Sequence, residues 1–198
     1  MRKATRHGAC GGATVLGLGP TKVLALDLNL LHHHPRREIE QVIAHELKHY
    51  LYDDDRKALY AAILIIVSGL GFLYLGTGFA IRAKRPGWGF GRIADPASLP
   101  LLVLLALIFS LAATAGFRSY GHHVEREADK FSLKLTNDRV AQAALLQRLL
   151  ACSRLKNPDM GWVQKTFRQN HPSMRDRLEI ARTYQWPLSG TSPAVATD

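Results

Sequence analysis

The chain has 198 residues with a formal net charge of +10, and hydrophobic residues make up 47% of it. Its two cysteines, Cys10 and Cys152, lie far apart and outside any CxxC pattern, which excludes a zinc site built from cysteines. The basic residues are scattered and show neither aromatic interleaving nor a known nucleic-acid-binding module. We therefore expect no nucleic acid as a partner, and anionic lipid head groups as the counterpart of the charge.

Two short apolar runs near the N-terminus, Ala13–Leu18 and Thr21–Leu28, predict a β-hairpin. Both runs are rich in valine and leucine, and a glycine and a proline separate them, as in a turn between two strands. The edge of a strand just ahead of an active-site helix can pair with an extended substrate. A hairpin that only covers that helix is the alternative interpretation.

A long helix is predicted to follow Pro35, because proline is favoured in the first turn of a helix and neither Gly nor Pro interrupts residues 36–56. The three histidines at positions 32–34 are interpreted as a solvated loop before this helix. The three aspartates at positions 53–55 lack the alternating spacing of a calcium-binding loop. We interpret them as the polar end of the helix.

Within this helix, residues 45–49 have the HExxH pattern. Residues at i and i+4 share one face of a helix, so His45 and His49 can direct their imidazoles at one zinc ion. Glu46 can reach a water molecule on that metal and accept its proton as the water attacks a peptide carbonyl. The alternative is an ordinary amphipathic helix with two histidines on its surface.

A catalytic zinc takes three protein ligands and keeps one position open, so a third ligand must come from elsewhere. We predict Glu125, on a charged helix over residues 118–135. Asp129 lies one turn further on the same face and can accept a hydrogen bond from a ligating histidine. The alternative for this helix is a salt-bridged surface. Three other side chains on it are weaker candidates for the ligand: Glu127, His122 and His123.

Two uncharged blocks, Ala58–Ile81 and Ala97–Phe117, predict a pair of membrane-spanning helices. At about 1.5 Å per residue each is long enough to cross a hydrocarbon core of about 30 Å. The basic, glycine-rich connection between them carries Trp88, as is common at a membrane interface. A buried helical hairpin in a soluble protein would need a much larger domain around it than this chain offers.

These features predict a mainly α integral membrane zincin with a short β-hairpin before the active helix, a two-helix transmembrane hairpin and a C-terminal helical part. Further helices are expected over residues 139–155 and 162–168, and a last one ends near Tyr184. We expect one metallopeptidase domain over residues 1–182, followed by a flexible tail over 183–198. Its three parts are expected at residues 1–57, 58–117 and 118–182.

Four motifs in order resemble the membrane gluzincin family of the CAAX prenyl proteases and the stress protease HtpX. They are AHELKHY at 44–50, the two hydrophobic spans, VEREAD at 124–129 and HPSMRDRL at 171–178. The likeness extends over about residues 12–182. The resemblance implies that zinc is the cofactor and that His45, His49 and Glu125 are its ligands. It also implies that Glu46 is the base and that Asp129 accepts a hydrogen bond from a ligand.

The last motif matches the HP-x4-R segment of that family, which implies that His171 and Arg177 lie close to the active site. A histidine there can steady the oxyanion of the tetrahedral intermediate or occupy the open position of the zinc at rest. A loop that caps a helix is the alternative. Lys48 departs from the family, which usually has glycine at this position, and we expect it on the helix surface.

The predicted function is a zinc-dependent metalloendopeptidase that hydrolyses polypeptides associated with a membrane. The first segment shows no signal peptide and two spans return the chain to the same side, so both halves of the metal site are expected to face the cytoplasm at a bacterial inner membrane. Members of the family have further membrane helices before this hairpin. The alternative is therefore a catalytically inactive or truncated protease-like membrane protein that acts as a binding scaffold.

Overall fold

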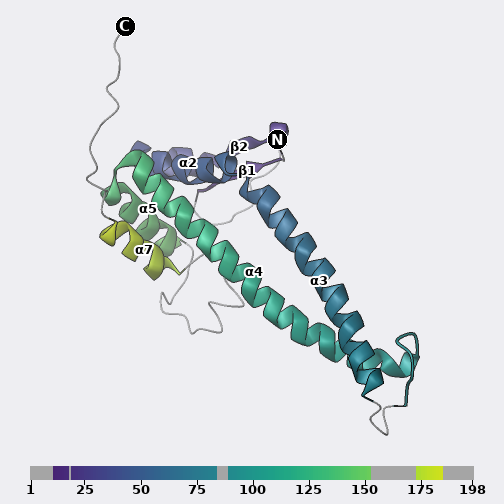
Figure 1. The fold of residues 1–198 in the computed structure, drawn as a ribbon. Helices are drawn as coiled ribbons and strands as arrows, with labels where there is room; N and C mark the ends of the chain where they lie inside the picture. The colour runs from purple at the N-terminus through teal and green to yellow at the C-terminus, as the bar shows by residue number, and fades with distance from the viewer. Residues whose placement is uncertain (1–10, 18, 84–88, 153–172, 185–198) are drawn as a thin grey trace, which may run out of the picture.

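The computed structural model describes residues 11–17, 19–83, 89–152 and 173–184, and this part of the chain is mostly helical. The short elements gather at one end of the molecule, and α3 and α4 project from it as a long pair (Figure 1). The elements are β1 (Ala13–Leu16), β2 (Val23–Leu26), α1 (Leu28–His33), α2 (Arg36–Leu51), α3 (Asp54–Arg82), α4 (Leu99–Thr136), α5 (Arg139–Cys152) and α7 (Met174–Thr183), with 3-10 turns at Gly19–Thr21 and Pro96–Ser98.

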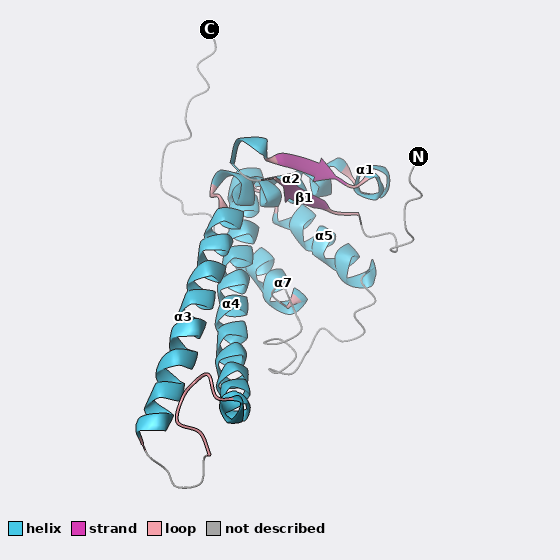
Figure 2. Cartoon of the chain, turned by 90° about the vertical axis from the view of Figure 1, so that its right-hand side faces the viewer, coloured by secondary structure: helices cyan, strands magenta, loops and turns pink. Residues whose placement is uncertain are grey.

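The predicted β-hairpin is confirmed. Strand β1 pairs antiparallel with β2, in a register that places Ala13 opposite Leu26 and Leu16 opposite Val23. Both strands are shorter than the apolar runs that predicted them. Gly17 turns the chain out of β1 at a φ of 93°, a conformation that glycine adopts without strain. Strand β2 lies between the 3-10 turn that ends at Thr21 and helix α1, which begins at Leu28. Figure 2 shows the hairpin lying beside α2.

The histidine run before Pro35 is not the solvated loop that the sequence suggested. Two of the three histidines belong to α1, whose first turn is capped by the Asp27 carboxylate accepting from the Asn29 N–H at 2.9 Å. The third, His34, is buried, and its Nδ1 lies 2.8 Å from the Glu38 carboxylate at the start of α2. His34 therefore has a packing role, whereas His32 and His33 are exposed on α1.

Helix α2 ends at Leu51, before the three aspartates, which corrects their interpretation as its polar end. Asp53 adopts the left-handed conformation with a φ of 53° and turns the chain, so that Asp54 and Asp55 form the first turn of α3. Acidic residues suit this position because the N-terminus of a helix carries partial positive charge. Lys22 fixes the turn by donating to the Asp53 carboxylate and, at 3.1 Å, to the Tyr50 carbonyl.

Helices α3 and α4 are long and apolar enough to cross a membrane. Each contains an 18-residue window with a mean hydropathy of 2.3, and none of either window is buried inside the protein. Large apolar side chains such as Leu64, Leu75 and Phe79 are 68–76% exposed. A hairpin in the core of a soluble protein would bury these side chains, so the arrangement supports the predicted transmembrane hairpin.

Small residues on α3 allow the two helices to approach closely, as expected inside a bilayer. A Cβ atom added at Gly69 would lie 2.8 Å from Cε1 of Phe109 on α4, and one at Gly76 would lie 3.1 Å from a methyl group of Leu105. The rings of Phe72 and Phe109 pack with their centroids 5.7 Å apart.

We expect the Gly69→Val substitution to destabilise the folded protein by about 1–3 kcal/mol, because the added branch meets the Phe109 ring and forces the helices apart. Thermal unfolding in detergent micelles measures the effect. Gly71→Val is the matched control, since a Cβ at Gly71 meets nothing within 4 Å. Equal unfolding temperatures for the two variants would show that the close contact does not hold the hairpin together.

The charged helix predicted after the second span is not a separate element. Helix α4 continues without a break from Leu99 to Thr136, so the expected boundary between residues 117 and 118 lies inside one helix. Its C-terminal half packs against α2, α5 and α7 around a small core. The fully buried side chains of this core include Leu30, Ala128, Leu133, Leu146 and Ala181.

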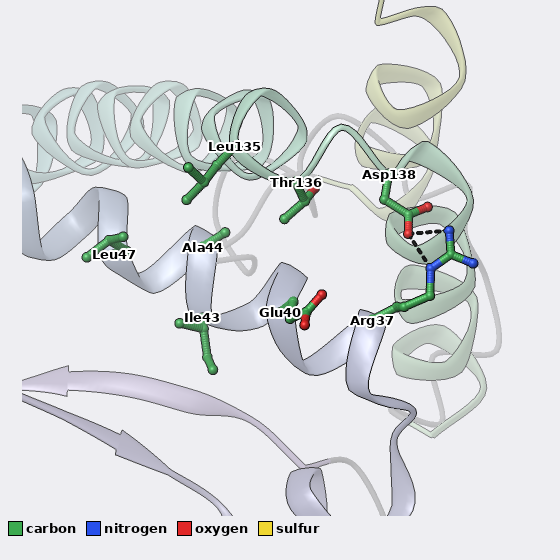
Figure 3. A pocket seen from close by; sticks show the side chains of 8 residues that line it. All are labelled: Arg37, Glu40, Ile43, Ala44, Leu47, Leu135, Thr136 and Asp138. Carbon is green, nitrogen blue, oxygen red and sulfur yellow. Dashed lines mark hydrogen bonds and ion pairs between the residues drawn. The ribbon is translucent and has the colours of Figure 1, made fainter. Parts of the chain in front are cut away.

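Helix α5 begins as predicted at Arg139, and α7 ends at Thr183, close to the predicted end. Asp138 joins α2 to this part of the chain, because its carboxylate accepts from Arg37 at 2.6 Å (Figure 3). The helix predicted over residues 162–168 and most of the predicted tail lie outside the described residues.

Candidate metal centre

Helix α2 presents two histidines to one point in the interior. His45 and His49 are one turn apart, and their Nε2 atoms lie 3.3 Å from each other. Both side chains are 13% exposed, so neither is a surface histidine. This geometry matches the prediction made from the HExxH spacing, and it contradicts an ordinary helix with two solvent-facing histidines.

Glu125 reaches the same point from α4. Its Oε2 lies 3.3 Å from Nε2 of His45, and its Oε1 lies 3.7 Å from Nε2 of His49. One ligand atom from each of the three residues lies within 4.8 Å of the others. Ligands about 2.0–2.2 Å from a tetrahedral zinc are separated by about 3.3–3.6 Å. The donor set therefore fits a zinc ion without rearrangement of the backbone.

The other ring nitrogen of each histidine faces a carboxylate. Nδ1 of His45 lies 3.1 Å from Asp129, and Nδ1 of His49 lies 2.8 Å from Asp54. Each carboxylate accepts a hydrogen bond from the Nδ1–H group, which keeps the proton on Nδ1 and leaves the lone pair of Nε2 directed at the centre. Two such lone pairs and the Glu125 carboxylate then converge, and a bound cation satisfies all three.

Arg177 holds Asp129 in place. Its Nε and Nη2 donate to the two carboxylate oxygens at 2.7 and 2.6 Å, and the Asp129 side chain is only 1% exposed. Burial favours the neutral acid, but the hydrogen bonds from Arg177 and His45 prevail and lower the pKa of Asp129. The sequence predicted Asp129 and Arg177 near the site, and the structure brings both there.

The electrostatics of the metal-free site favour a cation. Burial lowers the pKa of His45, but hydrogen bonds to Asp129 and Glu125 outweigh burial and raise the pKa to about 9. A proton therefore resides on His45 near neutral pH until a metal ion displaces it. The surrounding carboxylates stabilise the positive charge of a protonated His45 and that of a bound metal ion alike.

Glu46 is close enough to the three candidate ligands for their charges to affect its pKa, but it is not one of the converging ligand group. Burial is the main cause of a raised pKa for Glu46, and an interaction with the backbone of Val15 in strand β1 partly opposes that rise. A carboxylate with a raised pKa is a stronger base than one in water, which suits a group that must take a proton near neutral pH. Strand β1 packs against α2, the helix that carries Glu46.

Two residues of the site were missed by the sequence analysis. Asp54 was assigned to the end of the active helix, and Lys48 to its surface. Lys48 is in fact 7% exposed, and its Nζ donates to the Asp54 carboxylate at 2.8 Å. The only signal in the sequence was a carboxylate five residues after the second histidine.

The weaker ligand candidates do not reach the centre. Glu127 pairs with Lys130 at 2.9 Å on another face of α4, and the group of potential metal ligands in the described part of the chain contains neither His122 nor His123. His171, predicted to act in catalysis, lies outside the described residues.

The pocket drawn in Figure 3 is a separate feature of about 590 Å³ between α2 and the end of α4. Its lining includes Glu40, Ile43 and Leu47, which lie on the face of α2 opposite the two histidines. None of the candidate ligands lines it, so it is not part of the metal centre.

Comparisons with known proteins agree with this geometry. The sequence profile described as Peptidase family M48 matches residues 12–185. The chain is 30% identical over 172 residues to a protein of Bacillus subtilis (strain 168) named uncharacterized metalloprotease YhfN, covering 85% of this chain and 39% of that protein. It is 31% identical over 168 residues to a Nostoc protein named protease HtpX homolog, covering 77% and 55%. No solved structure matches the chain significantly.

Proposed function

The chain belongs to peptidase family M48, and from this premise we propose that it is a zinc-dependent metalloendopeptidase of a membrane. The observation that carries the proposal is the convergence of two histidine Nε2 atoms and the Glu125 carboxylate, with both Nδ1 atoms held by buried carboxylates. The chain spans about half or less of the length of the relatives described above, 39% and 55%. The activity of a complete protein is therefore part of this proposal.

The residues present assign each step of peptide hydrolysis to a side chain. His45, His49 and Glu125 hold the metal, which when bound lowers the pKa of a water molecule and polarises the substrate carbonyl. Glu46 accepts a proton as the water oxygen bonds to the carbonyl carbon. The same carboxyl group then gives that proton to the leaving nitrogen as the C–N bond breaks. By resemblance to the family, His171 steadies the oxyanion in between.

The substrate proposed is a polypeptide in extended form, bound beside strand β1. This strand has one partner, β2, within the described part of the chain, and its other edge faces α2. The backbone of Val15 is close enough to Glu46 to influence its pKa, so a peptide paired with β1 would place its own backbone near the base. This supports a substrate-binding edge over a hairpin that merely covers the helix.

The two apolar helices support a membrane-associated substrate and a site at the membrane surface. Helix α2, which carries both histidines, lies at the end of the helix pair where α3 begins (Figure 1), and it packs against α4, which carries Glu125. Both halves of the site would therefore share one side of a bilayer that the pair crosses. We propose that this side is the cytoplasm and that the membrane is a bacterial inner membrane.

The proposal predicts that purified protein contains one zinc per chain and cleaves casein in detergent, and that His45→Ala loses both. Removal of one of three protein ligands leaves a site that binds zinc too weakly to retain it. Metal content by atomic absorption and casein cleavage are the two measurements. His32→Ala, which changes an exposed histidine of α1, is the control and should retain both.

A wild-type protein that binds no metal would overturn the enzyme assignment. It would favour the alternative, a protease-like membrane protein that acts as a binding scaffold. The same result would leave the fold and the membrane helices as described.

A further inference from the structure

A buried ion pair lies where the active-site helix passes into the first membrane helix. Nζ of Lys48 on α2 and Oδ2 of Asp54 on α3 are 2.8 Å apart, and the two side chains are each 9% exposed. The same Oδ2 lies 2.8 Å from Nδ1 of His49. One carboxylate oxygen thus accepts from a metal ligand and from a lysine at once.

Two further contacts hold the Lys48 ammonium group in place. Its Nζ donates at 3.2 Å to the carbonyl oxygen of Val124, the residue directly before Glu125 on α4. It also lies 5.9 Å from the centroid of the Tyr52 ring. Asp54 is therefore held against His49 by a cation that is itself bonded to the helix carrying the third ligand.

This arrangement repeats the one around the other histidine. Asp129 faces Nδ1 of His45 and is held by Arg177, and Asp54 faces Nδ1 of His49 and is held by Lys48. In each case a buried cationic side chain bonds to the carboxylate and orients it on a ligand. Each cation also comes from a different element than its carboxylate does.

Resting on the proposed zinc function, we propose that Asp54 is the positioning residue for His49 and that Lys48 acts through it. The pair sets the Nδ1–H tautomer and the ring orientation of His49, and so the affinity and geometry of the metal site. Because Asp54 begins α3, the membrane hairpin supplies a part of the metal centre. A pair that only ties α2, α3 and α4 together is the competing explanation.

The test measures metal binding rather than cleavage alone. Zinc affinity is determined by competition with a chromogenic chelator, and the ligand field by the visible spectrum of the cobalt-substituted protein. Loss of a carboxylate bonded to a metal-ligating histidine typically weakens metal binding about 10–100-fold. We expect about 10-fold or more for Asp54→Asn and for Lys48→Met, with a changed cobalt spectrum in both.

Two neighbours serve as matched controls. Asp55→Asn changes the exposed aspartate next to Asp54, and Lys57→Met removes a lysine that lies 5.7 Å from the same Tyr52 ring. Both should keep the wild-type zinc affinity and cobalt spectrum. Asp54→Glu is the conservative variant, and we expect it to restore part of the affinity because a carboxylate remains.

The competing explanation gives a different pattern. If the pair is only structural, Asp54→Asn and Lys48→Met lower the unfolding temperature of the metal-free protein, while the folded fraction binds zinc as tightly as wild type and shows its cobalt spectrum. That outcome overturns the positioning role and leaves the proposed function intact. A wild-type protein without zinc overturns both.

Discussion

Glu46→Gln is expected to bind zinc as wild type does and to cleave casein at least about 100-fold more slowly. Glutamine keeps the size of the side chain and a carbonyl oxygen that can face the Val15 backbone, so the structure around it should stay in place. It cannot accept a proton from water, and a positioned general base contributes about 10²–10⁴-fold to a rate. The measurements are metal content and the initial rate of cleavage.

Glu40→Gln is the control on the same helix, because the Glu40 side chain is 49% exposed and forms an ion pair with Arg36 on the helix surface. It should show the wild-type rate. An unchanged rate for Glu46→Gln together with full zinc content would remove Glu46 as the base. The assignment of the metal ligands would be unaffected, but another group would have to accept the proton.

Arg177→Ala is expected to destabilise the protein by about 3 kcal/mol and to weaken zinc binding. The substitution leaves the Asp129 carboxylate buried without the two hydrogen bonds that it receives at 2.7 and 2.6 Å. Breaking a buried pair by removing one partner costs about 3–5 kcal/mol. Without Arg177, the charged form of the Asp129 carboxylate and its orientation toward His45 are both less stable. Thermal unfolding in detergent, with and without zinc, measures both effects.

Arg177→Lys should recover only part of the loss, because a lysine cannot make the two parallel hydrogen bonds of a guanidinium. Arg182→Ala on the same helix is the control, since Arg182 is exposed. If Arg177→Ala and Arg182→Ala unfold at the same temperature, the pair with Asp129 does not stabilise the fold.

Local patterns predicted most of the fold and the core of the site. The HExxH spacing and the four-residue step from Glu125 to Asp129 depend only on helical geometry, which is the same wherever a helix occurs. The two uncharged blocks depend only on the thickness of a bilayer. The hairpin followed from two apolar runs on either side of Gly19 and Pro20.

The features that were wrong or missed depend on where helices end. The end of α2 at Leu51 is set by Asp53 in a left-handed conformation, and aspartate is not a strong signal for it. Without that boundary, Asp54 could not be assigned to α3, nor its contact with His49 foreseen. Lys48 was placed on the surface because periodicity does not show which helix will cover a polar face.

The continuity of α4 was missed for a related reason. The change from apolar to charged residues at Arg118 marks the point where the helix passes from lipid to water. Composition alone does not distinguish such a passage from the end of a helix. No proline interrupts the segment from Val103 to Thr136, so the backbone continues through the change.

The unbroken helix α4 fixes the distance between its apolar, membrane-spanning part and the proposed metal ligand Glu125. The charge-free part of α4 ends at Phe117, and Glu125 follows eight residues later in the same rigid rod. At about 1.5 Å per residue the carboxylate can stand no more than about 12 Å beyond that point, and tilt only shortens the height. Under the proposed function, a polypeptide anchored in the same bilayer would have to present its scissile bond within this shallow layer, neither inside the lipid nor far out in solution.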